Sequence, residues 1–134
     1  MDWEPLIQAA TAVRENAYMP YSRYAVGAAL LADDDRIYVG CNVENRTYGL
    51  TICAERVAVG TAVASGAKHV RAVVVVTDSE PPGTPCGPCR ETLTEFGDAA
   101  TAVLLVNTRG ERVEHRLGDL LPFPFELPAD DPSS

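Results

Sequence analysis

TICAER at residues 51–56 and PCGPCR at residues 85–90 are the two stretches around which the rest of this sequence is organised. They place three cysteines, Cys53, Cys86 and Cys89, and one carboxylate, Glu55, in a chain of 134 residues. Helix-forming residues follow each stretch, so each is expected to stand at the start of a helix. The two stretches therefore predict where two helices begin and where the chemistry of the protein lies.

Outward from these stretches, the hydrophobic pattern predicts alternating helices and strands. We expect a helix over 3–18, a hairpin of strands over 26–31 and 37–41, a helix over 53–65, a strand over 70–77, a helix over 87–96, strands over 102–106 and 112–116, and a short helix over 117–121. The segment 53–65 is apolar on nearly every side, which predicts a central, buried helix. This order favours an α/β fold of three layers, α/β/α, with helices on both faces of one mixed sheet of about five strands.

Length, composition and charge limit the number of domains and the class of partner. A chain of 134 residues with 46% apolar content can build one core, so we expect one domain over residues 1–126 and a mobile acidic tail over 127–134. The net charge of −8 opposes contact with phosphate, so neither a nucleic acid nor an anionic membrane is an expected partner. The sequence shows neither a long apolar run nor an export signal at its start, which predicts a cytoplasmic protein with reduced cysteines.

The three cysteines suit a catalytic zinc site, which takes three ligands from the protein and leaves a fourth position for water. Cys86 and Cys89 have a spacing that lets two thiolates reach one ion, and helix N-termini favour the thiolate form. Glu55 is then placed to move protons near the ion, although an acidic residue is also common in a first helical turn. Arg56 and Arg90 could donate to the sulfurs and offset their charge, or simply lie on helix surfaces.

The combined motifs resemble those of the short-form, zinc-dependent cytidine deaminases. The resemblance is carried by YSRYAVGAA at 21–29, GCNVEN at 40–45, YGLTICAER at 48–56 and PCGPC at 85–89. It implies hydrolytic deamination of cytidine and 2′-deoxycytidine to uridine and 2′-deoxyuridine plus ammonia, in pyrimidine salvage. It also implies one Zn²⁺ per subunit, with Cys53, Cys86 and Cys89 as the ligands and Glu55 as the catalytic proton shuttle.

The resemblance further implies a set of residues that bind the nucleoside. Asn42 and Glu44 would bind a ribose hydroxyl, and these two side chains can offer donors and acceptors to such a group. The backbone of Ala54 would meet the base carbonyl. Tyr24 stands where the family commonly has Phe and would form an aromatic wall, or else be an ordinary core aromatic. An uncharged nucleoside also agrees with the acidic balance of the chain, since a polynucleotide would call for a basic surface.

Assembly is a further implication of the resemblance. Short-form members are homotetramers whose pockets borrow residues from neighbouring subunits, which implies that Tyr48 and Phe125 cross a subunit boundary. Aromatic residues that merely cover a core are the alternative. One departure is Arg46, where the family usually has a small residue, and a long cation there would affect substrate range or subunit packing.

Three other interpretations compete with this one. A structural zinc site with Cys41 as a fourth ligand would make the protein a binding module. A deaminase of a related aminopyrimidine nucleoside, such as blasticidin S, would share the zinc motifs. A dithiol-exchange role would use only Cys86 and Cys89, and it would leave Cys53 and Glu55 without a purpose.

Overall fold

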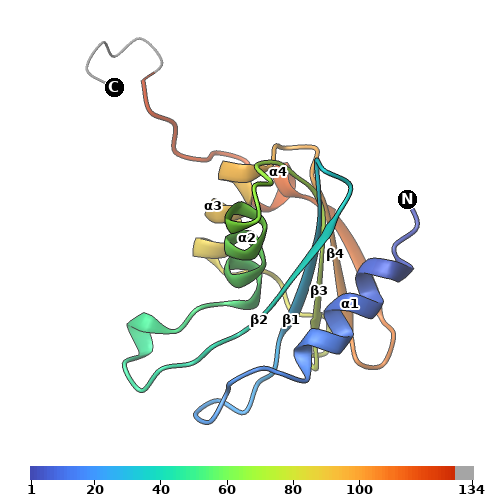
Figure 1. Ribbon diagram of the computed structural model, residues 1–134, viewed down its shortest axis with the longest axis vertical. Helices are drawn as coiled ribbons and strands as arrows, with labels where there is room; N and C mark the ends of the chain where they lie inside the picture. Colours follow the sequence, from blue (N-terminus) through green and yellow to red (C-terminus); the bar gives the residue numbers. More distant parts are fainter. Residues whose placement is uncertain (129–134) are drawn as a thin grey trace.

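The computed structural model describes residues 1–128 and contains one five-stranded sheet with helices on both faces (Figure 1). The elements are α1 Glu4–Arg14, β1 Gly27–Ala32, β2 Ile37–Cys41, the 3-10 helix η1 Tyr48–Leu50, α2 Ala54–Ala64, β3 Val70–Thr77, α3 Gly87–Phe96, β4 Ala102–Asn107, β5 Arg112–Arg116 and α4 Leu117–Leu120. The predicted α/β/α architecture with a mixed sheet is confirmed.

The order of strands brings two helix starts to the same edge of the sheet. The strands run in the order β2-β1-β3-β4-β5, in which β3 and β4 are parallel and the other neighbours are antiparallel. Because β1 is antiparallel to both β2 and β3, these two strands point the same way and end at the same edge. The chain after β2 leads into α2, and the chain after β3 leads into α3. Both helices therefore begin beside one another.

Strand β3 is the centre of the molecule because it is covered on both faces. Its valines alternate between two cores: Val73 and Val75 pack on the side of α2, whereas Val74 and Val76 pack on the side of α1. All four are at most 2% exposed. A continuous β-branched run is typical of such a strand, and each buried valine contributes roughly 1.5–3 kcal/mol.

Two expectations about the helices are corrected by the structure. Helix α1 ends at Arg14, not near residue 18, because Tyr18 instead donates its N–H to Asn42 O and accepts the N–H of Glu44. Helix α2 is not buried on every side: the sheet covers Ala58 and Ala62, while Val63 on the outer face is 40% exposed.

The C-terminal part of the chain is described as far as residue 128. The tail expected over 127–134 lies outside the described residues, except for its first two. Within residues 1–128, none of the helices combines the length and the apolar character that crossing a membrane requires.

Candidate active site

Cys53 and Cys86 occupy equivalent positions, each as the N-cap residue of a helix with extended backbone. Cys53 is brought there by a two-residue bridge, in which Val43 and Ile52 exchange N–H···O hydrogen bonds of 2.9 Å and return the 42–52 loop to the body. The first turns of α2 then pack directly on β2, because a Cβ at Gly40 would lie 2.3 Å from the backbone nitrogen of Ala58.

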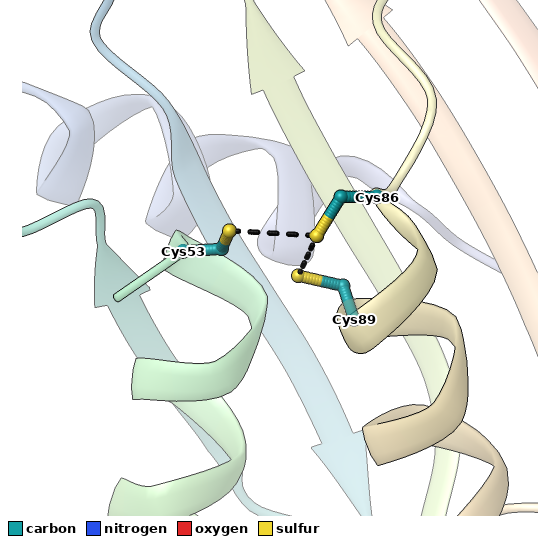
Figure 2. Close-up of side chains that lie close together, drawn as sticks. All are labelled: Cys53, Cys86 and Cys89. Carbon is teal, nitrogen blue, oxygen red and sulfur yellow. Dashed lines mark hydrogen bonds between the residues drawn. The ribbon is translucent and has the colours of Figure 1, made fainter. Parts of the chain in front are cut away.

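The three cysteine sulfurs form one cluster between the starts of α2 and α3, as Figure 2 shows. The Sγ atoms of Cys53 and Cys86 are 3.5 Å apart, those of Cys86 and Cys89 are 3.1 Å apart, and all three lie within 4.8 Å of one another. Sulfurs that bind one tetrahedral zinc at about 2.3 Å lie roughly 3.8 Å from each other. The cluster therefore fits a zinc ion. Cys41 is not a member of it.

Within the cluster, the pKa values of Cys53 and Cys89 are shifted in opposite directions. The hydrogen bond from Cys89 is the largest of the effects that lower the pKa of Cys53 to about 5, and Cys86 and Arg56 act in the same direction. The pKa of Cys89 is raised, chiefly by the same hydrogen bond and then by burial. Cys53 therefore becomes a thiolate, the form in which cysteine binds metal, before Cys89 does.

The two arginines that follow the motifs have different partners. Arg56 Nη2 lies 3.9 Å from Cys53 Sγ and donates to Thr51 O at 3.1 Å. For Arg90 the sequence left open a bond to a sulfur or a place on the helix surface. Its Nε and Nη1 donate to the carbonyl oxygens of Pro85 and Leu120, at 2.8 and 2.9 Å. Arg90 thus holds the backbone before Cys86 rather than the sulfur.

Glu55 is a buried carboxyl beside the cysteines. It is 5% exposed, and it lines the same cavity as Cys53 and Cys86. Burial, reinforced by the charge of Cys53, raises the pKa of Glu55 to about 7. A carboxyl with such a pKa can both accept and release a proton near neutral pH.

The cavity has a volume of about 460 Å³, which is within the range of small-molecule sites. It is lined by Ser22, Tyr24, Val26, Asn42, Glu44, Thr51, Cys53, Ala54, Glu55, Val75, Thr77, Gly83, Thr84 and Cys86. The structure thus brings Cys53, Cys86, Glu55, Ala54, Asn42, Glu44 and Tyr24 to one cavity, from segments far apart in the sequence. Cys89 belongs to the sulfur cluster but is fully buried. Most of the surface of this cavity is apolar, and hydroxyl, amide and carboxyl groups reach it at separate points, which suits a flat ligand with polar edges.

Asn42 stands at the end of β2 and is 8% exposed. Its Oδ1 accepts the N–H of Val26 at 2.9 Å, and its Nδ2 donates to Tyr24 O at 2.7 Å. These two bonds fix the orientation of the amide. A primary amide has two N–H groups and two acceptor lone pairs, so Asn42 retains capacity for a ligand.

Glu44 is oriented by the segment that precedes β1. Its Oε1 accepts the backbone N–H groups of Tyr21 and Ser22, at 3.0 and 3.1 Å. The Ser22 side chain is the largest of the effects that lower the pKa of the Glu44 carboxyl, and these two N–H groups add to it. Glu44 is therefore held as a carboxylate at the mouth of the cavity, with its second oxygen available to a hydroxyl.

Tyr48 and Phe125 lie outside the cavity of their own chain. Tyr48 is 76% exposed and packs edge to face on Tyr21, with ring centroids 6.3 Å apart, in a recess that adjoins Glu44. Phe125 is 79% exposed and lies against α3, beside Glu91 and Glu95.

Several residues of the cavity wall were not anticipated from the sequence. Val26, Val75 and Thr77 were predicted as strand residues, and Gly83 and Thr84 lie between the predicted strand over 70–77 and the predicted helix over 87–96. The only signal for the last two was the position of a Pro-Pro-Gly loop directly before Cys86. A loop that leads into a metal ligand is often a pocket wall.

Comparison with known proteins gives one family. The model of the "Cytidine and deoxycytidylate deaminase zinc-binding region" matches residues 2–105. The cytidine deaminase of Sporosarcina psychrophila is 47% identical over 125 residues, which cover 93% of this chain and 92% of that protein. That of Mycobacterium tuberculosis strain H37Rv is 44% identical over 127 residues, with 95% and 92% coverage.

Solved structures agree with the sequence relatives. The crystal structure of cytidine deaminase from Burkholderia pseudomallei superposes with a TM-score of 0.89 at 45% identity, covering 93% of this chain and 100% of that one. The M. tuberculosis enzyme gives a TM-score of 0.81 at 43% identity, with 95% and 99% coverage.

Proposed function

This chain belongs to the cytidine and deoxycytidylate deaminase family, and from that premise we propose that it catalyses the hydrolytic deamination of cytidine and 2′-deoxycytidine. The products are uridine or 2′-deoxyuridine and ammonia. The observation that carries this proposal is the buried Glu55 carboxyl beside a three-cysteine cluster, in a cavity of nucleoside size.

Cys53, Cys86 and Cys89 would hold one Zn²⁺ in each subunit, and when bound the ion supplies Lewis-acid activation of the attacking water. Three protein ligands leave one coordination position open. Cys53 and Cys86 both line the cavity, so an ion held by the three sulfurs would adjoin a substrate bound there.

Glu55 would carry the protons of the reaction. The water must lose both protons as its oxygen becomes the C4 carbonyl: one proton moves to N3 and the other to the departing amine, while the C4–N bond breaks. A single carboxyl can transfer both in turn if its pKa lies near neutrality, and burial places the pKa of Glu55 at about 7.

The remaining cavity residues would bind the nucleoside. We assign the ribose hydroxyl to Asn42 and Glu44, whose free donor and acceptor groups face the cavity after their fixed bonds are counted. The backbone of Ala54 at the start of α2 would bind the base carbonyl. The ring of Tyr24 would form the wall beside the base.

We also propose that the protein is a homotetramer with shared pockets. The support is the apolar surface left open by one chain: the outer face of α2 with Val63, the exposed ring of Tyr48, and Phe125. Because Phe125 lies away from the cavity of its own chain, its use in a site requires a neighbouring subunit. Arg46, exposed on the same loop as Tyr48, would lie at this boundary.

We further propose a single domain, a cytoplasmic location and a role in pyrimidine salvage. Both cores share one sheet, which supports a single domain over residues 1–126. Cysteines bind zinc only when they are reduced, which supports the cytoplasm as the location. The reaction itself supports a role in pyrimidine salvage, with a free nucleoside rather than a nucleic acid or a membrane as the partner.

The test is an ultraviolet assay of the purified protein with cytidine, 2′-deoxycytidine and blasticidin S. We expect the first two to be consumed and the activity to disappear with a chelator and return with Zn²⁺. Turnover of blasticidin S alone would instead identify the protein as a deaminase of a related aminopyrimidine nucleoside. A protein that holds zinc and consumes none of the three would overturn the proposal.

A further inference from the structure

A chain of hydroxyl groups runs behind one wall of the cavity. The hydroxyl of Tyr24 and Oγ of Ser79 are hydrogen-bonded at 2.8 Å, and Ser79 Oγ and Thr77 Oγ1 at 2.9 Å. The N–H of Gly83 then donates to Thr77 Oγ1 at 3.1 Å. Tyr24 precedes β1, whereas the other three residues stand at the end of β3 and in the loop that follows. The chain therefore joins two segments that are far apart in the sequence.

The wall itself is packed against this chain without spare room. A Cβ added to Gly83 would lie 2.9 Å from the Tyr24 hydroxyl and 3.0 Å from Ser79 Oγ, so the glycine backbone rests directly on the hydroxyls. Tyr24, Thr77 and Gly83 all line the cavity. The position of the Gly83 backbone, and hence the width of the cavity at this point, depends on the hydroxyl chain.

The other side of the 78–84 loop is already fastened to the sheet. Asn107 Nδ2 donates to Ser79 O at 3.2 Å, and Thr108 Oγ1 donates to Asp78 Oδ1 at 2.6 Å. These bonds hold the beginning of the loop to the turn after β4. The bond from Tyr24 to Ser79 is the attachment on the opposite side, toward the cavity.

We propose that the Tyr24 hydroxyl is a positioning group for substrate binding: by fixing Ser79, Thr77 and Gly83 it closes the wall between the segment before β1 and the 78–84 loop. This rests on the proposed function. A phenylalanine at position 24 would supply the ring without the hydrogen bond to Ser79. The Tyr24 hydroxyl is therefore a feature of this protein that an aromatic cavity wall by itself does not require.

The proposal separates binding from chemistry. Glu55 and the cysteines are held by α2 and α3, and the hydroxyl chain does not include them. Loss of the chain loosens a wall that contacts substrate and transition state alike, which raises KM and leaves kcat unchanged. A neutral hydrogen bond is worth about 1 kcal/mol, so we expect about a fivefold change in KM.

The experiment uses the zinc-loaded protein and the variants Tyr24→Phe, Ser79→Ala and the double variant. For each we would measure kcat and KM for cytidine, the Kd of the product uridine by calorimetry, and the melting temperature. Tyr18→Phe is the matched control, since that side chain is 56% exposed and its hydroxyl makes no hydrogen bond within residues 1–128.

Support would be a rise of about fivefold in KM and in the Kd of uridine for each single variant, with kcat within twofold of wild type. In the double variant, KM and the Kd of uridine should be no higher than in the more affected single variant, because both substitutions remove the Tyr24–Ser79 hydrogen bond. An unchanged KM and Kd in Tyr24→Phe, effects that multiply in the double variant, or a fall in kcat alone would each overturn the proposal. An inactive wild-type protein would instead refute the proposed function, and the Kd of uridine would still test the wall.

Discussion

The Sγ atoms of Cys53 and Cys86, 33 residues apart in the sequence, lie 3.5 Å from each other at the starts of two neighbouring helices. Two strands that point the same way place both helix starts at one edge of the sheet. The metal site is thus a consequence of topology, and its ligands hold α2 and α3 together as well as the ion.

Removal of a ligand is expected to cost metal and stability together. Cys89→Ala should lose most of its zinc, and its melting temperature should become insensitive to a chelator, because zinc stabilises only the folded cluster. The wild-type protein should lose several degrees under the same chelator. Metal analysis and thermal unfolding measure both effects.

Cys41→Ser is the matched control for that prediction, since Cys41 lies outside the cluster. It should retain a full complement of zinc. A loss of zinc in Cys41→Ser comparable to that in Cys89→Ala would support the alternative interpretation, a structural zinc site with four cysteine ligands.

Glu55→Gln is expected to remove catalysis and preserve the site. Glutamine has nearly the same shape, so zinc content and fold should persist, whereas it cannot accept a proton. The loss in kcat should be about 10²–10⁴-fold or more, as for a positioned general acid and base. Steady-state kinetics with metal analysis of the same sample checks this, and near-normal turnover would exclude Glu55 as the proton carrier.

Glu44→Gln should change both KM and the acid sensitivity of the fold. The pKa of Glu44 in the folded chain is below its ordinary value near 4.5, so the folded state binds fewer protons there than the unfolded state. Its contribution to stability is complete above pH about 4.5 and is lost as the pH falls through the lower folded pKa.

Urea unfolding at pH 7 and in steps below pH 4.5 should therefore show that acid lowers the free energy of unfolding less in Glu44→Gln than in the wild type. Glu114→Gln, at an exposed position of β5, is the control and should follow the wild type. An identical loss in Glu44→Gln and the wild type would show that the bonds from Tyr21 and Ser22 do not stabilise the carboxylate. KM for cytidine should rise in Glu44→Gln alone.

Val63→Asp should dissociate the proposed tetramer. Val63 is 40% exposed on the outer face of α2, where a carboxylate is harmless in water and costly at a subunit contact. Sedimentation should show a smaller species, and activity should fall in parallel, because each pocket would lose the residues of its neighbour. A tetramer that survives the change would place the interface elsewhere.

The order of elements and the chemistry of the cysteines could be predicted from the sequence because they depend on local patterns. Apolar periodicity, helix starts and the four-valine run of β3 are each read from consecutive residues, and all are found in the structure. The spacing of Cys86 and Cys89 likewise predicts that their sulfurs can reach one ion, because about one helical turn separates the two residues.

The tertiary structure decided what depends on contacts between distant segments. The apolar sequence of α2 predicted burial on all sides, but one sheet covers only one face of a helix, so Val63 stays open. Arg90 directly follows Cys89, yet its partners are the carbonyl oxygens of Pro85 and Leu120. The bond from Tyr24 to Ser79 spans 55 positions, and no local pattern encodes it. Sequence periodicity determines which residues face inward, whereas the packing of distant segments determines what they meet there.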